Sequence, residues 1–242
     1  MTIQSNRTLG LLGACFTVVG AVSTVFSLFR YFYPTSLAAD FAVSAVVGAV
    51  GVLAFVGFIL FLVAMYGFSN DYGERRIFNY VLYGILIGIV AAIATVIAMF
   101  AVFFAYLASI LPSFSPSAMP SSTEIQSLLL PYLAPFLGAF GFVALINIVL
   151  DVLAFNLLGD KSGVSMFRTA AKVLLAGGLL MAVSGVVFAV FAYVNLITYE
   201  QLTLLVVPGG VVQEIAWLLL AVAFFRIQPP PAQTTVPPTY SA

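Results

Sequence analysis

Apolar residues run along this chain in long blocks that only short polar segments interrupt. A helix needs roughly 20 apolar residues to cross a hydrocarbon core about 30 Å thick. None of the blocks alternates polar and apolar residues as the strands of a membrane barrel do. The pattern predicts an all-α fold, a polytopic transmembrane helical bundle over residues 1–226, with six spans at Leu9–Phe29, Phe41–Phe68, Tyr80–Leu111, Leu128–Leu158, Val173–Leu196 and Leu202–Phe225.

The composition agrees with this pattern. Hydrophobic residues make up 63% of the chain and charged residues only 7%, far from the mixture in soluble domains. The partner that this composition predicts is the lipid bilayer. The formal net charge of zero says nothing about nucleic acid, and for this membrane protein we expect no nucleic-acid partner.

The cations give the bundle an orientation. In a six-span topology only Arg30 falls on one side of the membrane, and the opposite side carries Arg7, Arg75, Arg76, Lys161, Arg168, Lys172 and Arg226. Because cytoplasmic loops carry the excess of Lys and Arg, we expect both termini in the cytoplasm and a multipass protein of the plasma membrane.

Two short motifs near the N-terminus offer alternatives. Leu12 to Cys15 resembles a lipoprotein cleavage box, but the apolar run continues well past the cysteine. Asn6-Arg7-Thr8 is a glycosylation sequon, which would require an N-terminus outside the cell. An uncleaved first helix and a chance sequon explain both motifs better.

The third and fourth spans exceed what a bilayer requires, so we expect them to tilt, kink or project outward. The Pro- and Ser-rich segment PSFSPSAMPSS joins them as an outer loop, and Pro131 and Pro135 should bend the helix that follows. At the other end of the chain, the Pro-rich residues 227–242 cannot form a packed core and are expected to be a disordered cytoplasmic tail.

The two predicted cytoplasmic turns share features. Asp71 followed by Glu74 has the spacing of a capping box, and Gly73 permits a turn with positive φ. Asp71 and Phe78 have the same separation as Asp160 and Phe167 in the second turn. This repeat suggests that the hairpin of spans two and three resembles that of spans four and five.

The first of these turns also carries a family resemblance, in Gly67, Phe68, Ser69, Asp71, Tyr72, Gly73, Ile77, Phe78, Asn79 and Tyr83. With the Gly-rich first span, these residues resemble an archaeal family of integral membrane proteins known as domain of unknown function 996. The resemblance extends over Met1 to Arg226. It implies an archaeal plasma-membrane location and no established activity, so it transfers no functional residue.

The residues that intramembrane enzymes require are missing from the sequence. Histidine is absent, which removes the general base of a serine protease and a common metal ligand, and Cys15 is the single cysteine. Asp151 lacks a second aspartate in a span to form a protease dyad. We therefore expect no enzymatic activity, no cofactor and no metal site.

A few polar residues nevertheless lie inside the spans, and Asn147, Asp151, Gln213 and Glu214 form the candidate intramembrane site. A carboxylate in lipid is costly unless it faces protein, water or a partner, so both should point into the bundle. They can serve as interhelical hydrogen bonds or ion pairs, for example between Asp151 and Lys172. The alternative role is an ion or proton path.

The sixth span contains a candidate helix break at Pro208, Gly209 and Gly210. Proline removes one backbone donor and the glycines lower the cost of unwinding, so the helix should kink or open there. An opened helix would place amide groups close to Glu214, as in transporters with broken helices. A simple proline kink is the other outcome.

Small residues predict where helices approach one another. Gly84, Gly88 and Ala92 form a ridge on the third span, and Gly48, Gly51, Gly177 and Gly178 should act similarly. Such seams suit a compact bundle, a homo-oligomer or a larger membrane complex. They favour a structural or interaction component of the membrane, and the alternative is a small-solute, ion or proton-linked transporter or channel that uses the intramembrane carboxylates.

Overall fold

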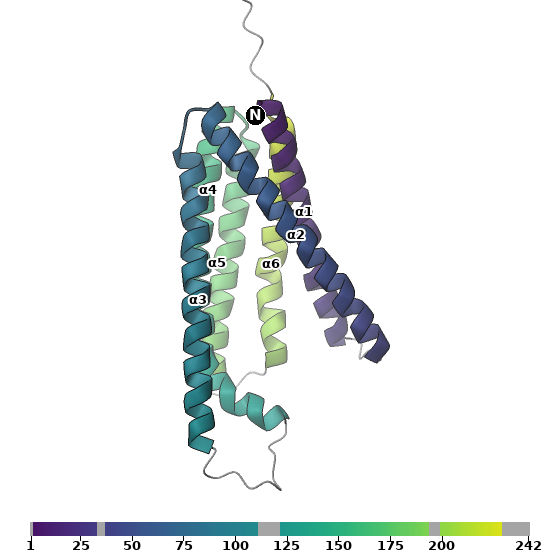
Figure 1. Ribbon diagram of the computed structural model, residues 1–242, viewed down its shortest axis with the longest axis vertical. Helices are drawn as coiled ribbons and strands as arrows, with labels where there is room; N and C mark the ends of the chain where they lie inside the picture. The colour runs from purple at the N-terminus through teal and green to yellow at the C-terminus, as the bar shows by residue number, and fades with distance from the viewer. Residues whose placement is uncertain (1, 33–36, 111–121, 194–198, 229–242) are drawn as a thin grey trace, which may run out of the picture.

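The computed structural model describes residues 2–32, 37–110, 122–193 and 199–228 (Figure 1). Side chains are described mainly within 2–20, 44–104, 141–191 and 207–228. The secondary structure of the described residues is helical, which confirms the all-α prediction, with α1 at Ile3–Phe32, α2 at Leu37–Asp71, α3 at Arg76–Ile110, α4 at Ser122–Ser162, α5 at Met166–Tyr193 and α6 at Tyr199–Arg226.

Five of these helices, α2 to α6, are long and apolar enough to cross a membrane. The description of α1 side chains ends at Gly20, so the first span stays a prediction, as does the cytoplasmic placement of the termini. The outer loop at 112–121 and most of the tail lie outside the described residues.

The two long spans have the expected length. α3 has 35 residues and α4 has 41, more than a bilayer about 30 Å thick requires. Figure 1 shows the first turns of α4 at a steep angle to the rest of that helix. Pro131 and Pro135 lie in this early part of α4, where such a bend was predicted.

The helices are arranged as a ring. Each helix packs against the next one in the chain, and α6 closes the ring by packing against α1. The α2–α3 contact is the least extensive. Figure 1 shows the reason, because α1 and α2 form a pair that diverges from α3 to α6 at the end of the bundle opposite the N-terminus.

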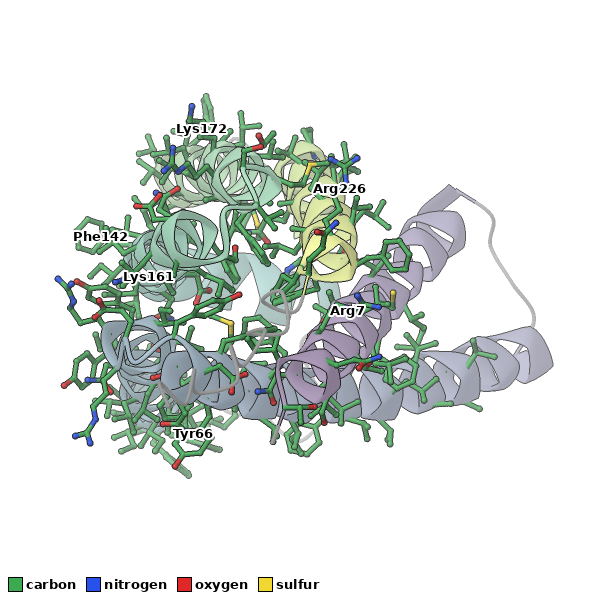
Figure 2. The ribbon with its side chains drawn as sticks, turned by 90° about the horizontal axis from the view of Figure 1, so that it is seen from above. Arg7, Tyr66, Phe142, Lys161, Lys172 and Arg226 are labelled. Atoms are coloured by element: carbon green, nitrogen blue, oxygen red, sulfur yellow. The ribbon has the colours of Figure 1, made fainter. Side chains whose placement is uncertain are left out.

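We call the other end, which carries Arg7, Lys161 and Arg226, the basic end. Figure 2 looks onto this end. The buried core lies in this half of the bundle, where the helices converge (Figure 1). Aromatic rings fill it in edge-on and stacked pairs 5.0–6.5 Å apart, contributed by Phe61, Phe68, Phe155, Phe167, Trp217 and Phe224. Such pairs add about 0.5–1.5 kcal/mol each beyond the burial of their area.

The two turns at the basic end have matching geometry, but not the predicted one. Gly73 and Gly163 have φ of 63° and 72°, and in both turns a helix begins three residues later. Counting from these glycines pairs Ile77 with Phe167, both fully buried. The predicted pairing of Phe78 with Phe167 is therefore wrong by one residue, because the turn glycine sets the register.

The predicted capping box of Asp71 and Glu74 is also wrong. Asp71 is the last residue of α2, and its Oδ2 accepts a 2.6 Å hydrogen bond from Nδ2 of Asn6 in α1. Asn6 is fully buried and its side chain lies against Gly67, where a Cβ would collide with it. Because Asn6 is buried, its side chain is not accessible for glycosylation, so the Asn6-Arg7-Thr8 sequon is a chance match. α1 continues past Cys15 without interruption.

Glycines mark the closest helix contacts. A Cβ at Gly13 of α1 would lie 2.8 Å from the Gly57 carbonyl oxygen of α2, and one at Gly209 of α6 would lie 3.1 Å from the Gly177 oxygen of α5. Gly177, Gly178 and Gly88 thus confirm the packing prediction. Gly48 and Gly51 do not, because nothing described lies within 4 Å of a Cβ there.

Candidate functional site

Asp151 lies on the inward face of α4. It is partly buried and stands one helical turn before Phe155, so the two side chains share a face. Phe155 is fully buried and contacts Phe61 of α2 and Trp217 of α6 across the ring. Asp151 therefore faces the interior of the bundle, as predicted.

Glu214 has the equivalent place on α6. It lies one turn before Trp217, whose ring is 5.3 Å from that of Phe61 and 6.5 Å from that of Phe155. The lipid-facing side of the same helix is formed by Val211, Ile215, Leu218, Val222 and Phe225, which are 40–62% exposed. Glu214 is partly buried and points away from that side.

The two carboxylates lie at one depth. α4 and α6 run in the same direction, and at 1.5 Å per residue Asp151 lies about 16 Å before Ser162 while Glu214 lies about 18 Å before Arg226. Phe155 and Trp217, one turn further along each helix, meet across the ring with ring centres 6.5 Å apart. Asp151 and Glu214 thus lie at a similar depth, near the middle of the two spans.

No cation neutralises these carboxylates within the described part of the chain. The ion pairs there join Glu74 to Arg76 and Lys161, and Asp160 to Arg168, all at the basic end. Lys172 is exposed and points outward from α5 in Figure 2. It does not form the predicted pair with Asp151.

One oxygen of this site lacks any hydrogen-bond partner. Glu214 Oε2 is buried, and no donor from the described residues reaches it. A buried acceptor without a partner costs about 1–3 kcal/mol, so the fold retains a polar group that it does not satisfy itself. Such a group is suited to a ligand, water or a proton.

The other two predicted site residues are turned elsewhere. Asn147 lies against α3, where a Cβ on Gly88 would be 2.9 Å from its Nδ2, and its buried Oδ1 has no described donor. Gln213 lies against α5, since a Cβ on Gly177 would be 2.9 Å from its Cγ. Asn147 and Gln213 therefore lie at helix seams, the first between α3 and α4 and the second between α5 and α6.

The candidate helix break is not open. α6 is helical from Tyr199 to Arg226, with Pro208 inside it. Gly209 packs against Met181 and Gly177 of α5, so this glycine serves close helix contact rather than unwinding. Opening would expose carbonyl groups in lipid and lose that contact, which explains why the helix persists through the proline.

The carboxylate pair lies at the edge of the core. Ala154 and Ala216, which follow Asp151 and Glu214 toward the basic end, are fully buried. Toward the opposite end, α1 and α2 diverge from the other helices (Figure 1). The site therefore lies where the aromatic packing stops.

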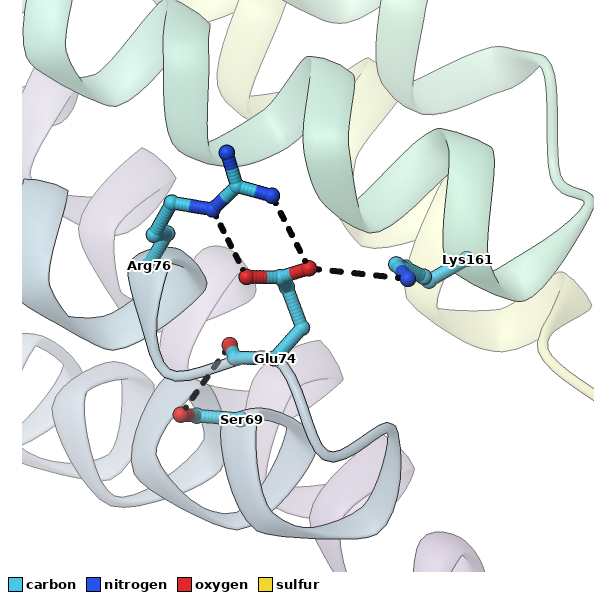
Figure 3. A network of polar contacts seen from close by, with 4 residues as sticks. All are labelled: Ser69, Glu74, Arg76 and Lys161. Carbon is cyan, nitrogen blue, oxygen red and sulfur yellow. Dashed lines mark hydrogen bonds and ion pairs between the residues drawn. The ribbon is translucent and has the colours of Figure 1, made fainter.

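A second polar cluster was not identified as a site from the sequence. Glu74 accepts hydrogen bonds from Arg76 at 2.8 and 3.2 Å, and its Oε2 is 3.5 Å from Lys161 Nζ, which ties the α2–α3 turn to the end of α4 (Figure 3). Ser69 donates to the Glu74 carbonyl. The hydrogen bonds from Arg76 are the main cause that lowers the pKa of Glu74 from 4.5 to about 2.

This cluster is a structural tie between hairpins. Its two cations, Arg76 and Lys161, are exposed and both pair with the Glu74 carboxylate. In the described residues, no group of three or more His, Cys, Asp or Glu side chains could hold a metal ion. Asp151 and Glu214 each offer carboxylate oxygens, and a carboxylate can take up a proton.

Comparison with known proteins places the chain in a family. A family described as "Protein of unknown function (DUF996)" matches residues 53–194. The match covers more than half of the chain but is shorter than the expected Met1 to Arg226, and it includes Asp151 but not Glu214. Comparison with curated proteins and with solved structures gives no match. The chain belongs to this uncharacterised family of proteins, DUF996.

Proposed function

We propose that this protein moves protons or small cations across the plasma membrane, with Asp151 and Glu214 as the site that the ion occupies. The observation that supports the proposal is the presence of two carboxylates at a similar depth in the spans, one on α4 and one on α6, with no basic partner among the described residues. Ionisable groups inside spans are costly, and they mark ion pathways and proton relays in membrane proteins.

The chemistry suits small positive ions. An ionised carboxylate inside a span is costly, and a bound proton or cation neutralises its charge. The buried Glu214 Oε2, which has no partner among the described residues, is an acceptor oxygen that an ion could use. Hard monovalent cations bind to such oxygen atoms, whereas an anionic substrate would be repelled.

A flux assay with matched variants tests the proposal. The full-length protein is reconstituted in liposomes that contain a pH-sensitive dye, and a potassium diffusion potential drives proton or cation entry. Glu214→Gln and Asp151→Asn keep the side-chain shapes and remove the charges, so each should reduce flux to the leak of empty liposomes. Asp160→Asn is the control, because Asp160 pairs with Arg168 at the exposed basic end. Equal flux for wild type and both site variants would overturn the transport role.

A structural or interaction role is the second candidate. It is favoured by Gly48 and Gly51 of α2, where the described chain leaves open space that another helix could approach. That partner would be a second copy of the chain or another membrane protein. A stoichiometric partner after purification from native membranes in mild detergent, together with liposomes that show no flux, would favour this role.

A further inference from the structure

A pocket of about 540 Å³ opens at the basic end of the bundle. Three elements line it: Arg7 of α1, the Gly163–Met166 turn before α5, and the end of α6 with Phe225, Arg226 and Gln228. It lies roughly 18 Å along α6 from Glu214 and is separate from the carboxylate pair. Its two charged side chains are both arginines.

Neither guanidinium is neutralised by a carboxylate of the described residues. Arg7 donates one hydrogen bond, from Nη1 to the Ile227 carbonyl at 3.2 Å, and its guanidinium lies 5.7 Å from the centre of the Phe225 ring. These contacts fix the side chain but leave most of its five N–H donors unused. Arg226 is exposed and has no ion pair there.

Backbone donors complete the pocket. The first hydrogen bonds of the α5 turn come from the amides of Phe167 and Arg168, which leaves the amides of Ser165 and Met166 without an acceptor in the described chain. Ser165 also offers its hydroxyl group, and Gln228 its amide. Two guanidiniums with free amides at a helix start are the donors that bind phosphate groups in proteins.

The position of the pocket indicates the source of that phosphate. Phe225 is 62% exposed and belongs to the lipid-facing side of α6, so the pocket borders lipid where the last apolar turn ends. Anionic headgroups lie at this level of a bilayer. We infer that the pocket binds the phosphate of an anionic phospholipid headgroup through Arg7, Arg226 and the amides of the α5 turn.

Lipid titration of the full-length protein in a neutral detergent tests the inference. Dioleoylphosphatidylglycerol is added, and the bound lipid is measured by native mass spectrometry. We expect Arg7→Gln and Arg226→Gln each to weaken the apparent Kd about tenfold or more, since each removes charge-assisted hydrogen bonds. Arg75→Gln is the matched control: Arg75 is exposed, makes no ion pair with described residues and does not line the pocket, so its loss should leave the Kd within about twofold.

A competition experiment distinguishes a lipid headgroup from a soluble phosphate compound as the ligand. Millimolar inorganic phosphate should not displace the lipid, because it lacks the acyl chains that Phe225 and its neighbours contact. Displacement by phosphate with the same dependence on Arg7 and Arg226 would overturn the lipid as ligand and identify a soluble phosphate compound instead. If Arg75→Gln weakened lipid binding as much as the two pocket variants did, or if no variant changed the apparent Kd, the pocket would not be the lipid-binding site. Arg7→Gln also removes the bond to Ile227, so Arg226→Gln, which breaks no described hydrogen bond, keeps the test independent of folding.

Discussion

At the scale of single residues, the same acidic groups serve different purposes according to their surroundings. Glu74 lies between two cations and is fixed by them. Glu214 faces the bundle interior with a partnerless oxygen. The sequence separates the carboxylates inside the spans from those in the turn between α2 and α3. The prediction that Asp71 and Glu74 form a capping box was wrong. The sequence could not reveal that Asn6, 65 residues away, takes Asp71 as its partner.

The Glu74 ion pairs predict a specific dependence on pH. The pKa of Glu74 is lowered from 4.5 to about 2, chiefly by its hydrogen bonds from Arg76, so the ionised form stabilises the fold. That stabilisation is complete above pH 4.5 and declines as the pH falls toward 2. Glu74→Gln should lower the Tm at about pH 7 and at about pH 5.5 by the same amount, and the difference from wild type should shrink toward about pH 2.

Thermal unfolding in detergent, followed by circular dichroism, measures this difference. Asp160→Asn removes another ion pair at the same end of the bundle and shows how much a general loss of surface charge contributes. A Tm difference that stays constant down to about pH 2, or that already shrinks between about pH 7 and 5.5, would contradict the role given to Glu74.

At the scale of helices, hydropathy predicted the elements but not which face of each helix has a neighbour. Gly177, Gly178 and Gly88 lie at close contacts, whereas no described residue lies within 4 Å of a Cβ at Gly48 or Gly51. In the sequence all five look alike, as glycines within apolar spans. The spacing of small residues shows that they share one face of a helix, but it does not show which neighbour covers that face. The same limit applies to Pro208, where close packing of Gly209 keeps α6 helical.

Two adjacent glycines of α6 test this packing. A Cβ at Gly209 would lie 2.5 Å from Met181 Cγ and 2.9 Å from its backbone nitrogen, whereas no described residue lies within 4 Å of one at Gly210. Gly209→Ala should destabilise the protein by about 1–3 kcal/mol through overpacking. Gly210→Ala should be neutral or stabilising by up to about 1 kcal/mol, since alanine favours helix. Equal Tm values for the two variants would show that α5 and α6 do not approach closely at Gly209.

At the scale of the whole molecule, long apolar blocks predicted an all-helical bundle, and the five span-capable helices agree. That Phe155 of α4 and Trp217 of α6 meet across the ring, each one turn from an intramembrane carboxylate, could not be predicted, because it depends on how the ring arranges the helices. The divergence of α1 and α2 was equally invisible in the sequence (Figure 1). The family match covers residues 53–194 and does not reach Glu214. Of the two carboxylates, Asp151 therefore lies within the matched part of the chain and Glu214 lies outside it, in α6.

The central claim is that Asp151 and Glu214 face an interior that ions and water reach, and single-cysteine labelling measures it directly. In a Cys15→Ser background, cysteine replaces Asp151 or Glu214, and a charged methanethiosulfonate reagent is applied to reconstituted protein. The matched controls are Leu153→Cys and Ile215→Cys, neighbours that are 43% and 46% exposed on the lipid-facing surface. The reagent reacts with thiols in water, so cysteines at 151 and 214 should be labelled and those at 153 and 215 should not. Unreactive cysteines at both 151 and 214, or equal labelling at 153 and 215, would contradict the account.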